Sequence, residues 1–545
     1  MQQCSVVIDK IEFKRIILHL EGRLVNLDGK KTKLYFRCEE NQTTIVPQHY
    51  DVEGDHFRVS MNVLSVNDES PMVSGNYYLT VEDEKKKKYH ARLSDRFEGT
   101  LDMEPDNPAN MRIHRNSGHY FHGFSVLDLD TEEYILQIKA SIPAKQDFYM
   151  KRNFRSWKAK QKKHLHEIKG YVFVSLFNFF NKVVKKKGNK ILFASGSRAE
   201  IGGNEEFIYK RMLERGLDKQ FKFRFDFKAN ITERRGIFKK IRFAYLLATS
   251  DIILIDDYYP DIYQVNFAKG VKVIQVWHAC GAFKALGLER MDKPGAPPLN
   301  TRVHKCYTAV PVSSEHSLRH HAEAFGIDES KFYPVGIPRT DIFFDEEYKK
   351  KMVQELHETF PQTKTAKKVY MYAPTFRGDN AVNAYFPFDR IDLKKWGKKL
   401  KEEGSLLLIK MHPFVHEKVQ IPEEYKDYII DAASYREVND LLFIVDVLIT
   451  DYSSIIYEFS LLGRPMYFYA FDRNMYVSTR DFYETYEDIV PGKIIKDFDE
   501  LLDTIGKDDY SKEALDAFVR KNFTYTDGKA TDRVIDQIIL GKDPE

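Results

Sequence analysis

The chain has 545 residues, of which 43% are hydrophobic and 30% charged, and its formal net charge is +3. This length is too great for one ordinary hydrophobic core and predicts about three domains, and the composition excludes a disordered chain. So small a net charge indicates no partner by itself, and no nucleic-acid partner is expected.

The cysteines and the N-terminus indicate the cellular compartment. Cys4, Cys38, Cys280 and Cys306 show neither paired nor metal-like spacing, so we expect free thiols in a reducing cytoplasm. The N-terminus lacks the basic-then-apolar form of a signal peptide, and no apolar run approaches the ~18–20 residues of a membrane span. We therefore expect a protein that is soluble or lies on a membrane surface, with no cofactor.

Residues 1–145 contain short strand-like runs such as RIILHLEG, KLYFRC and GNYYLTV, which turn-rich stretches such as NLDGKK and EPDNPAN separate. Short strands at this spacing predict an all-β, sandwich-like domain of about seven strands. This part of the sequence shows no catalytic constellation, so we interpret it as an accessory or partner-binding domain.

Residues 146–189 are expected to form a basic amphipathic linker. Between residues 151 and 190, Lys and Arg occur thirteen times against the single acidic residue Glu167. The run YVFVSLFNFFNKVV has one apolar helical face, which should carry Tyr171, Val174, Leu176, Phe177, Phe180 and Val184. Basic residues around such a helix suit an anionic membrane surface. The alternative is a linker helix that packs on the next domain beneath a solvated basic face.

From residue 190 onward the pattern alternates between strand and helix. Buried strand-like runs include ILFAS, DIILIDD, VYMYAP, LLLI and VLIT. This alternation predicts an α/β fold with parallel sheets. We expect two Rossmann-like lobes, residues 190–342 and 343–545, in the arrangement of a GT-B glycosyltransferase. Ligands of such folds bind in the cleft outside the carboxyl ends of the strands.

Four polar clusters follow predicted strands: Trp277-His278, Thr375-Phe376-Arg377, residues 410–413 (KMHP) and residues 451–454 (DYSS). One such cluster means little, because a lone strand-end histidine is more often structural. Four that converge on one cleft offer two imidazoles, an arginine suited to phosphate and a helix start. This combination indicates phosphoryl transfer.

The stretch LITDYSSIIYEFSLLGRP should turn from a buried strand directly into a helix. Ser453 and Ser454 stand where the helix begins, so they are expected to cap its free N–H groups. The helix dipole and those N–H groups would also attract an anion. Many serine-capped turns bind nothing, so this motif gains weight only with the others.

The motifs QVWHACGAFKALG, YAPTFRGD, LIKMHPF, TDYSSIIYEF and TRDFYE…PGKI occur in this order between residues 190 and 528. In these motifs the sequence resembles the CDP-glycerol glycerophosphotransferases of Gram-positive wall teichoic acid synthesis, and within them the poly(ribitol phosphate) polymerases. Glycerol-type members often carry a Thr-Pro pair after the Trp-His-Gly. Here His278 is followed by Ala-Cys-Gly-Ala-Phe, which favours the ribitol type.

The resemblance implies a CDP-alditol donor and a lipid-linked polyol phosphate acceptor, with CMP as the leaving group. It implies a location in the cytoplasm, peripheral on the inner face of the cell membrane. Through it His278 matches a general base and His412 a second catalytic histidine. The donor and phosphate contacts that it implies are Thr375, Arg377, Asp451, Ser453, Ser454 and Glu458.

Several alternatives stay open. The donor could be CDP-glycerol in teichoic acid or capsule synthesis, the enzyme could use a sugar nucleotide, or the chain could be a non-catalytic scaffold at the membrane. Homo-oligomerisation is also open. The loop of residues 196–204 either shapes the acceptor side or is a plain turn.

No metal is expected. Strand-end aspartates such as Asp256 and Asp257 commonly cap helices. Four further histidines are expected at the surface or at helix caps: His304, His316, His320 and His321.

Overall fold

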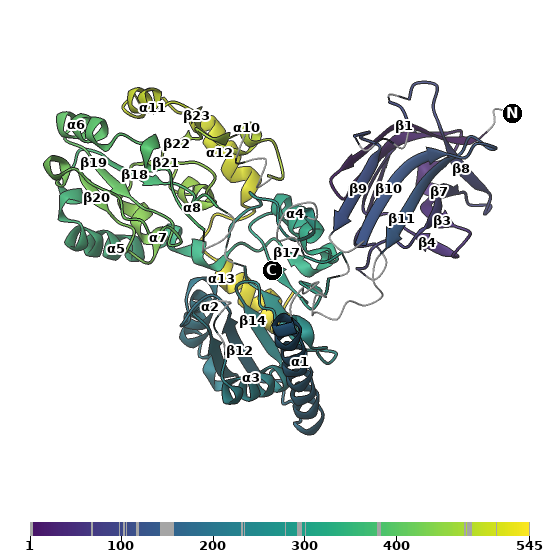
Figure 1. Cartoon of the computed structure of the whole chain (residues 1–545), viewed down its shortest axis with the longest axis horizontal. Coiled ribbons are helices and arrows are strands. Elements are labelled where there is room, and N and C mark those ends of the chain that lie inside the picture. The colour runs from purple at the N-terminus through teal and green to yellow at the C-terminus, as the bar shows by residue number, and fades with distance from the viewer. Residues whose placement is uncertain are drawn as a thin grey trace.

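The computed structural model describes most of the chain and shows a β-rich part beside two α/β lobes (Figure 1). The described residues are 4–66, 69–97, 99–101, 104, 106–115, 119–141, 157–229, 233, 235–277, 279–290, 297–299, 301–378, 383–473, 476, 482–507 and 509–543. The side chains of residue 30 and residues 157–167 lie outside this description.

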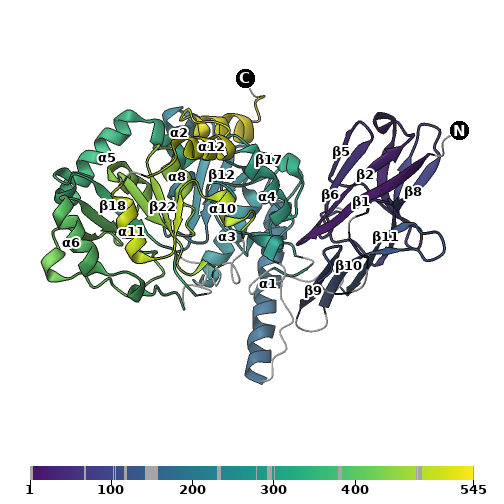
Figure 2. The ribbon, with the colours of Figure 1, turned by 90° about the horizontal axis from the view of Figure 1, so that it is seen from above.

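The N-terminal part is a single sheet of eleven strands among the described residues. Its order is β5-β6-β2-β1-β8-β7-β11-β10-β9, with β3 on β7 and β4 on β3. The sheet folds over one core that includes Leu20, Phe36, Tyr77 and Phe121 (Figure 2). The strands are β1 Ser5–Lys14, β2 Ile17–Val25, β3 Lys33–Cys38, β4 Thr43–Ile45, β5 His49–Glu53, β6 His56–Asn62, β7 Gly75–Glu82, β8 Lys88–Leu93, β9 Asn110–Arg115, β10 His119–Leu127 and β11 Tyr134–Ser141.

The strand-rich character of this part is confirmed, but eleven strands replace the expected seven or so. Strand β1 (SVVIDKIEFK) mixes charged and apolar residues, yet its even-numbered side chains Val6 and Ile8 are fully buried. Strand β5 (HYDVE) is an edge strand with no fully buried side chain. Such half-exposed strands give a weak hydrophobic signal, so the sequence underestimates their number.

Helix α1 (Trp157–Val183) packs along α3 (Ile237–Thr249) of the first lobe. Phe173 stacks on Phe243, and Phe177 is fully buried. The expected apolar face is therefore rotated: Phe173 joins the core, while Tyr171 is 60% exposed on the other side. In the part of the chain that the structure describes, no helix is both long enough and apolar enough to span a membrane.

The first lobe contains a parallel sheet of four strands in the order β13-β12-β14-β15. The strands are β12 Lys190–Ser195, β13 Lys222–Phe227, β14 Ile252–Ile255 and β15 Lys272–Gln275, and a small pair adds β16 Val310–Pro311 and β17 Phe332–Tyr333. Helices α1, α3 and α4 (Glu315–Phe325) cover one face, and α2 (Gly203–Glu214) covers the other.

The second lobe contains a parallel sheet of six strands in the order β20-β19-β18-β21-β22-β23. Its strands are β18 Val369–Ala373, β19 Leu406–Ile409, β20 Ile429–Asp431, β21 Val447–Thr450, β22 Met466–Tyr469 and β23 Lys493–Ile495. Its helices are α5 Glu346–Thr359, α6 Leu393–Glu403, α7 Val438–Leu441, α8 Ile455–Ser460, α10 Tyr486–Ile489, α11 Phe498–Ile505 and α12 Lys512–Asn522. The α/β character expected for this half of the chain is confirmed.

The end of the chain returns to the first lobe. Helix α13 (Ala530–Arg533) and the π-helix Val534–Leu540 lay Val534, Ile535 and Ile538 against Ile208 of α2. The range 343–545 expected for the second lobe therefore ends in a segment that packs on the first. Its apolar side chains pack beside α2 on the same face of the first lobe's sheet, a contact that the order of the sequence alone does not reveal.

Two of the four histidines expected at the surface or at helix caps are core residues. His304 is 6% exposed and stacks on Phe325 with a ring separation of 4.2 Å. His321 is 4% exposed, and its Nδ1 lies 2.7 Å from the carbonyl oxygen of Ser317. Each ring lies on an apolar surface with its polar edge satisfied, which is the usual condition for burying imidazole.

Candidate active site

A cleft of about 1490 Å³ lies between the two lobes. It is lined by the loop after β15, by the loops after β18 and β19, and by the start of α8. Five of the expected site residues line it: Thr375, His412, Ser453, Ser454 and Glu458. His278 lies outside the described residues, but both of its neighbours, Trp277 and Ala279, line the cleft.

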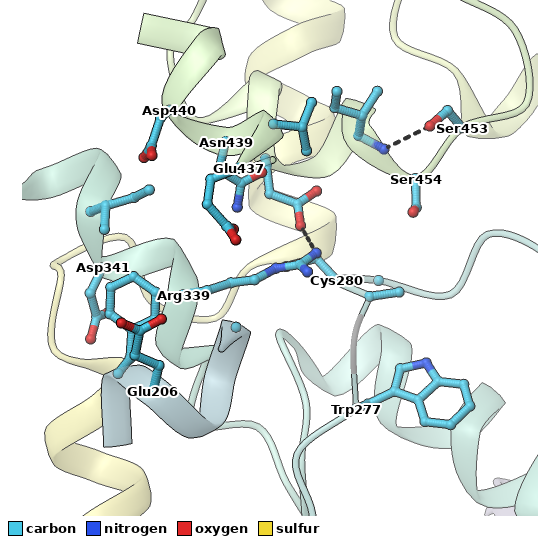
Figure 3. A pocket seen from close by; sticks show the side chains of 18 of the residues that line it. Glu206, Trp277, Cys280, Arg339, Asp341, Glu437, Asn439, Asp440, Ser453 and Ser454 are labelled. Carbon is cyan, nitrogen blue, oxygen red and sulfur yellow. Dashed lines mark hydrogen bonds and ion pairs between the residues drawn. The ribbon is translucent and has the colours of Figure 1, made fainter. Parts of the chain in front are cut away.

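The expected serine-capped turn is only partly as predicted. The Oγ of Ser453 accepts the backbone N–H of Ile455 at 3.4 Å, but Ser454, the N-cap residue, makes no capping hydrogen bond with its side chain. Figure 3 shows both serines among the side chains that line the cleft. Helix α8 spans only six residues, Ile455–Ser460, so individual hydroxyl and N–H groups matter more here than a long helix dipole.

An ion pair joins the lobes across the cleft. Arg339, from the first lobe, donates through Nη2 to Oε1 of Glu458 in α8 (Figure 3). Burial opposes the charge of Arg339, but Glu458 and Cys280 nearby raise its pKa. Arg339 was not found from the sequence, although its segment, GIPRTD, follows the short strand β17 and so carries the same strand-end signal as the other clusters.

Three polar atoms of cleft-lining side chains have no hydrogen-bond partner among the described residues: Thr375 Oγ1, Arg339 Nε and Glu458 Oε2. All three atoms are buried. A buried polar atom without a partner costs about 1–3 kcal/mol, so groups of this kind are suited to meet a polar ligand.

Arg377 and Asp451 do not line the cleft. The guanidinium of Arg377 donates to both carboxylate oxygens of Asp472 at 2.5 and 2.9 Å, and its Nη1 lies 3.0 Å from Asp451 Oδ2. Burial opposes its charge, yet the two carboxylates raise the pKa of Arg377. The other oxygen of Asp451 accepts the backbone N–H of Thr375 at 2.8 Å. This cluster therefore holds Thr375 in place from below the cleft.

His412 stands at the edge of the cleft between Phe376 and Phe414, with ring separations of 4.7 Å to each. Its Nδ1 accepts the backbone N–H of Phe414 at 3.2 Å. In the neutral ring the proton must then be on Nε2. The aromatic pair fixes the ring plane, so Nε2–H is a positioned donor.

The backbone next to His278 is strained, and hydrogen bonds hold it in place. Trp277 has a φ of 45°, an uncommon conformation for a residue other than glycine. The side-chain amide of Asn204 donates to the carbonyl oxygens of Val276 and Trp277 at 2.9 and 2.7 Å. Its oxygen accepts the backbone N–H of Arg339 at 3.0 Å. Asn204, a second residue that the sequence did not reveal, thus couples the strand end before His278 to the arginine of the interlobe pair.

The loop of residues 196–204 contributes Arg198 and Gly203 to the cleft, so it is more than a plain turn. The Nε of Arg198 lies 2.9 Å from Asp256 Oδ2, and Asp257 accepts the N–H of Tyr258. Asp256 therefore forms an ion pair and Asp257 makes a local contact with the next residue, and none of the described helices begins at either of them. Among the described residues they form no cluster suited to a metal.

The family described as CDP-Glycerol:Poly(glycerophosphate) glycerophosphotransferase matches residues 176–540. The chain belongs to this family. The resemblance found in the motifs is thereby confirmed, and with it the assignment to phosphotransferases.

Relatives with curated names extend the comparison. The teichoic acid ribitol-phosphate polymerase TarL of Staphylococcus aureus (strain NCTC 8325 / PS 47) is 37% identical over 98% of this chain and 99% of its own. The teichoic acid poly(ribitol-phosphate) polymerase of Bacillus spizizenii is 42% identical over 68% of this chain and 60% of its own. The solved structure of the wall teichoic acid polymerase TagF superposes with a TM-score of 0.57 at 24% identity, over 71% of this chain and 98% of that one, and shows a shared fold.

Proposed function

We propose that this enzyme transfers ribitol phosphate from CDP-ribitol to the terminal hydroxyl of a lipid-linked polyol phosphate chain and releases CMP. Ribitol is supported by relatives named ribitol-phosphate polymerases at 37–42% identity. A relative named for glycerol phosphate polymerisation is 32% identical over 39% of this chain. The observation that carries the proposal is the interlobe cleft, which is lined together by five of the residues that the family motifs predict.

The reaction forms one bond and breaks one. The acceptor hydroxyl oxygen attacks the phosphorus that bears the alditol, and the bond from that phosphorus to the CMP oxygen breaks. We assign removal of the hydroxyl proton to His278, because an imidazole with a pKa near 6.5 suits a general base at neutral pH. The strained Trp277 backbone and the Asn204 amide support this role by fixing the strand end before His278.

Charge that develops on the departing CMP and on the transferred phosphate needs fixed donors. The proposal assigns this task to His412 Nε2–H, to the hydroxyls of Thr375 and Ser454 and to the N–H groups at the start of α8. Arg339 supplies positive charge from the opposite lobe. These groups all line the same cleft, so the phosphates would lie between the lobes.

Arg377 and Asp451 receive a different role from the one the sequence indicated. Both guanidinium edges of Arg377 are occupied by carboxylates and the group is 5% exposed, so we assign it to positioning Thr375 through Asp451. Ser453 supports the start of α8, where its hydroxyl already accepts Ile455 N–H. The free Oε2 of Glu458 suits the ribose hydroxyls of the cytidine.

The proposed architecture is GT-B-like, with acceptor side 190–342 and donor side 343–545 except for the returning segment. The proposed location is the inner face of the cell membrane, docked through the outer face of α1. That face carries Lys169, Tyr171, Val172, Phe179, Lys182 and Val183, all exposed. Helix α3 beside it exposes Ile237 and Phe238 by 68% and 84%. Exposed apolar and basic side chains together suit an anionic lipid surface.

Donor choice tests the proposal. Purified protein is given a lipid-linked primer with either CDP-ribitol or CDP-glycerol, and CMP release is measured. We expect at least tenfold faster release from CDP-ribitol. Faster release from CDP-glycerol would assign the enzyme to the glycerol type, and no release from either would support the scaffold alternative.

A further inference from the structure

Three side chains of types that commonly bind metals lie close together at the junction of the two lobes, outside the cleft. They are His316 and His320 on α4 and Glu484, which stands just before α10 of the second lobe. One ligand atom from each side chain lies within 4.8 Å of the others, and the described residues hold no second group of this kind. The sequence placed both histidines only at the surface or at helix caps, because Glu484 is 168 positions beyond His316 and the cluster forms only in the fold.

The geometry is close to that of a first coordination shell. His316 and His320 are four positions apart, so both rings project from the same side of the helix, as in other helical metal sites. Their ring centres are 5.0 Å apart, and His316 Nε2 lies 2.7 Å from Glu484 Oε1. Ligands of a tetrahedral zinc ion are about 3.4 Å apart, so small side-chain rotations would complete the arrangement.

Neighbouring residues orient the three side chains, and a cavity gives an ion access to them. Lys521 contacts the second carboxylate oxygen of Glu484 at 2.5 Å, whereas Oε1 points to His316 on the side where an ion would bind. The ring of Tyr483 packs on His320 at 4.7 Å. Partners of this kind orient metal ligands in known sites. A cavity of about 650 Å³ between the β-rich part and α4 reaches both histidines, so an ion and a water ligand have access.

We propose that His316, His320 and Glu484 bind one divalent transition-metal ion of the zinc class, with water as the fourth ligand. Two nitrogen ligands and one oxygen ligand suit Zn²⁺ rather than Mg²⁺ or Ca²⁺, which prefer oxygen alone. This site is separate from the reaction centre and does not depend on the proposed function.

The ion would connect the first lobe to the segment around Glu484, which supports the cleft. Phe482, two residues before Glu484, accepts a hydrogen bond from Arg15 of the β-rich part through its carbonyl oxygen. Tyr486, two residues after Glu484, donates its hydroxyl to the carbonyl oxygen of Asp451 at 2.8 Å. A metal at Glu484 would therefore join three parts of the molecule and stiffen the support beneath Thr375.

Metal binding can be measured on the whole chain without any activity assay. The protein is stripped with a chelator and titrated with Zn²⁺ against a chromogenic competitor. We expect one equivalent bound with micromolar or tighter affinity. His316→Ala, His320→Ala and Glu484→Gln should each weaken that binding at least tenfold. Co²⁺ in place of Zn²⁺ should give the visible absorption bands of a four- or five-coordinate ion in the wild type but not in the three ligand variants.

The control is His357→Ala on α5, whose ring contacts Thr363 far from the cluster. It should bind Zn²⁺ like the wild type. Melting with and without Zn²⁺ supplies a second readout: Zn²⁺ should raise the melting temperature of the wild type and of the control, but not of Glu484→Gln. The proposal is overturned if the wild type binds no equivalent of Zn²⁺, or if the three ligand variants bind it as tightly as the control does.

Discussion

The guanidinium of Arg377 lies beneath the cleft between Asp451 and Asp472, and three aromatic rings surround it, those of Tyr452, Phe471 and Tyr476. Strands β18 and β21 are neighbours in the sheet, so the charges that follow them meet each other before they meet a ligand. The sequence predicted that these charges gather at one edge. It did not show that they neutralise one another there.

Arg377→Met should therefore act mainly on stability. Removing one partner from a buried ion pair leaves uncompensated carboxylates and costs about 3–5 kcal/mol. Denaturant unfolding of the variant should show a loss of this size. Arg473→Met is the matched control, because its partner Glu487 is half exposed and such pairs contribute about 0–1 kcal/mol. If the variant is as stable as the wild type but binds the donor more weakly, Arg377 contacts the phosphates of the donor instead.

His278→Ala tests the proposed general base. General-base catalysis contributes about 10²–10⁴-fold, so CMP release should fall at least about a hundredfold. Affinity for CDP-ribitol, measured by calorimetry, should stay close to that of the wild type, because the residue acts on the acceptor proton. Release within threefold of wild type would show that another group removes the proton.

At the scale of elements, the alternation of strands and helices was readable because buried parallel strands give continuous apolar runs. Helix α1 was harder. Tyr171 and Phe173 are both large and aromatic, and only the contact with Phe243 decides which one faces inward. Arg339 and Asn204 were missed for a similar reason: their roles come from tertiary contacts with Glu458 and with the strand end at Trp277.

The first lobe should lose stability in mild acid through His304. Burial lowers its pKa to about 3, whereas the unfolded chain has a pKa near 6.5. The unfolded state therefore binds the proton more readily than the folded state does. The contribution of His304 to the free energy of unfolding is fully present above pH ~6.5 and is lost as the pH decreases toward 3. The loss from this group is about 2 kcal/mol at pH 5.

Urea unfolding of the wild type and of His304→Asn at pH 7 and pH 5 tests this expectation. Asparagine tolerates the positive φ of 69° at this position. The variant should be less sensitive to pH by about the amount attributed to His304, and His357→Asn should behave like the wild type. Equal pH dependence in all three proteins would contradict the assignment.

For the molecule as a whole, docking through the outer face of α1 predicts binding to anionic liposomes that weakens with salt. Each lysine near the surface adds about 1 kcal/mol, screened over a Debye length. Replacing Lys182 at the end of α1, and Lys185 and Lys187 just after it, by Glu should release the protein from liposomes yet spare transfer to a short soluble acceptor. Lys186 is left in place because its Nζ is buried, and burial lowers its pKa.

The matched control reverses the same number of charges on the second lobe, at Lys394, Lys398 and Lys401 of α6, all exposed. Co-sedimentation of this control should equal that of the wild type. If the α1 variant also sediments like the wild type at low salt, the basic face of α1 is only solvated and does not dock on lipid.

The central claim is transfer of alditol phosphate at the interlobe cleft, and the mass of the product tests it most directly. Purified protein is incubated with CDP-ribitol and a lipid-linked primer. The mass of the product is measured by mass spectrometry, and the released CMP is quantified. The account predicts growth of the primer in steps of one ribitol phosphate, with one CMP released per step and growth slowed at least about a hundredfold in His278→Ala. CMP release without primer growth, or growth that His278→Ala leaves intact, would contradict it.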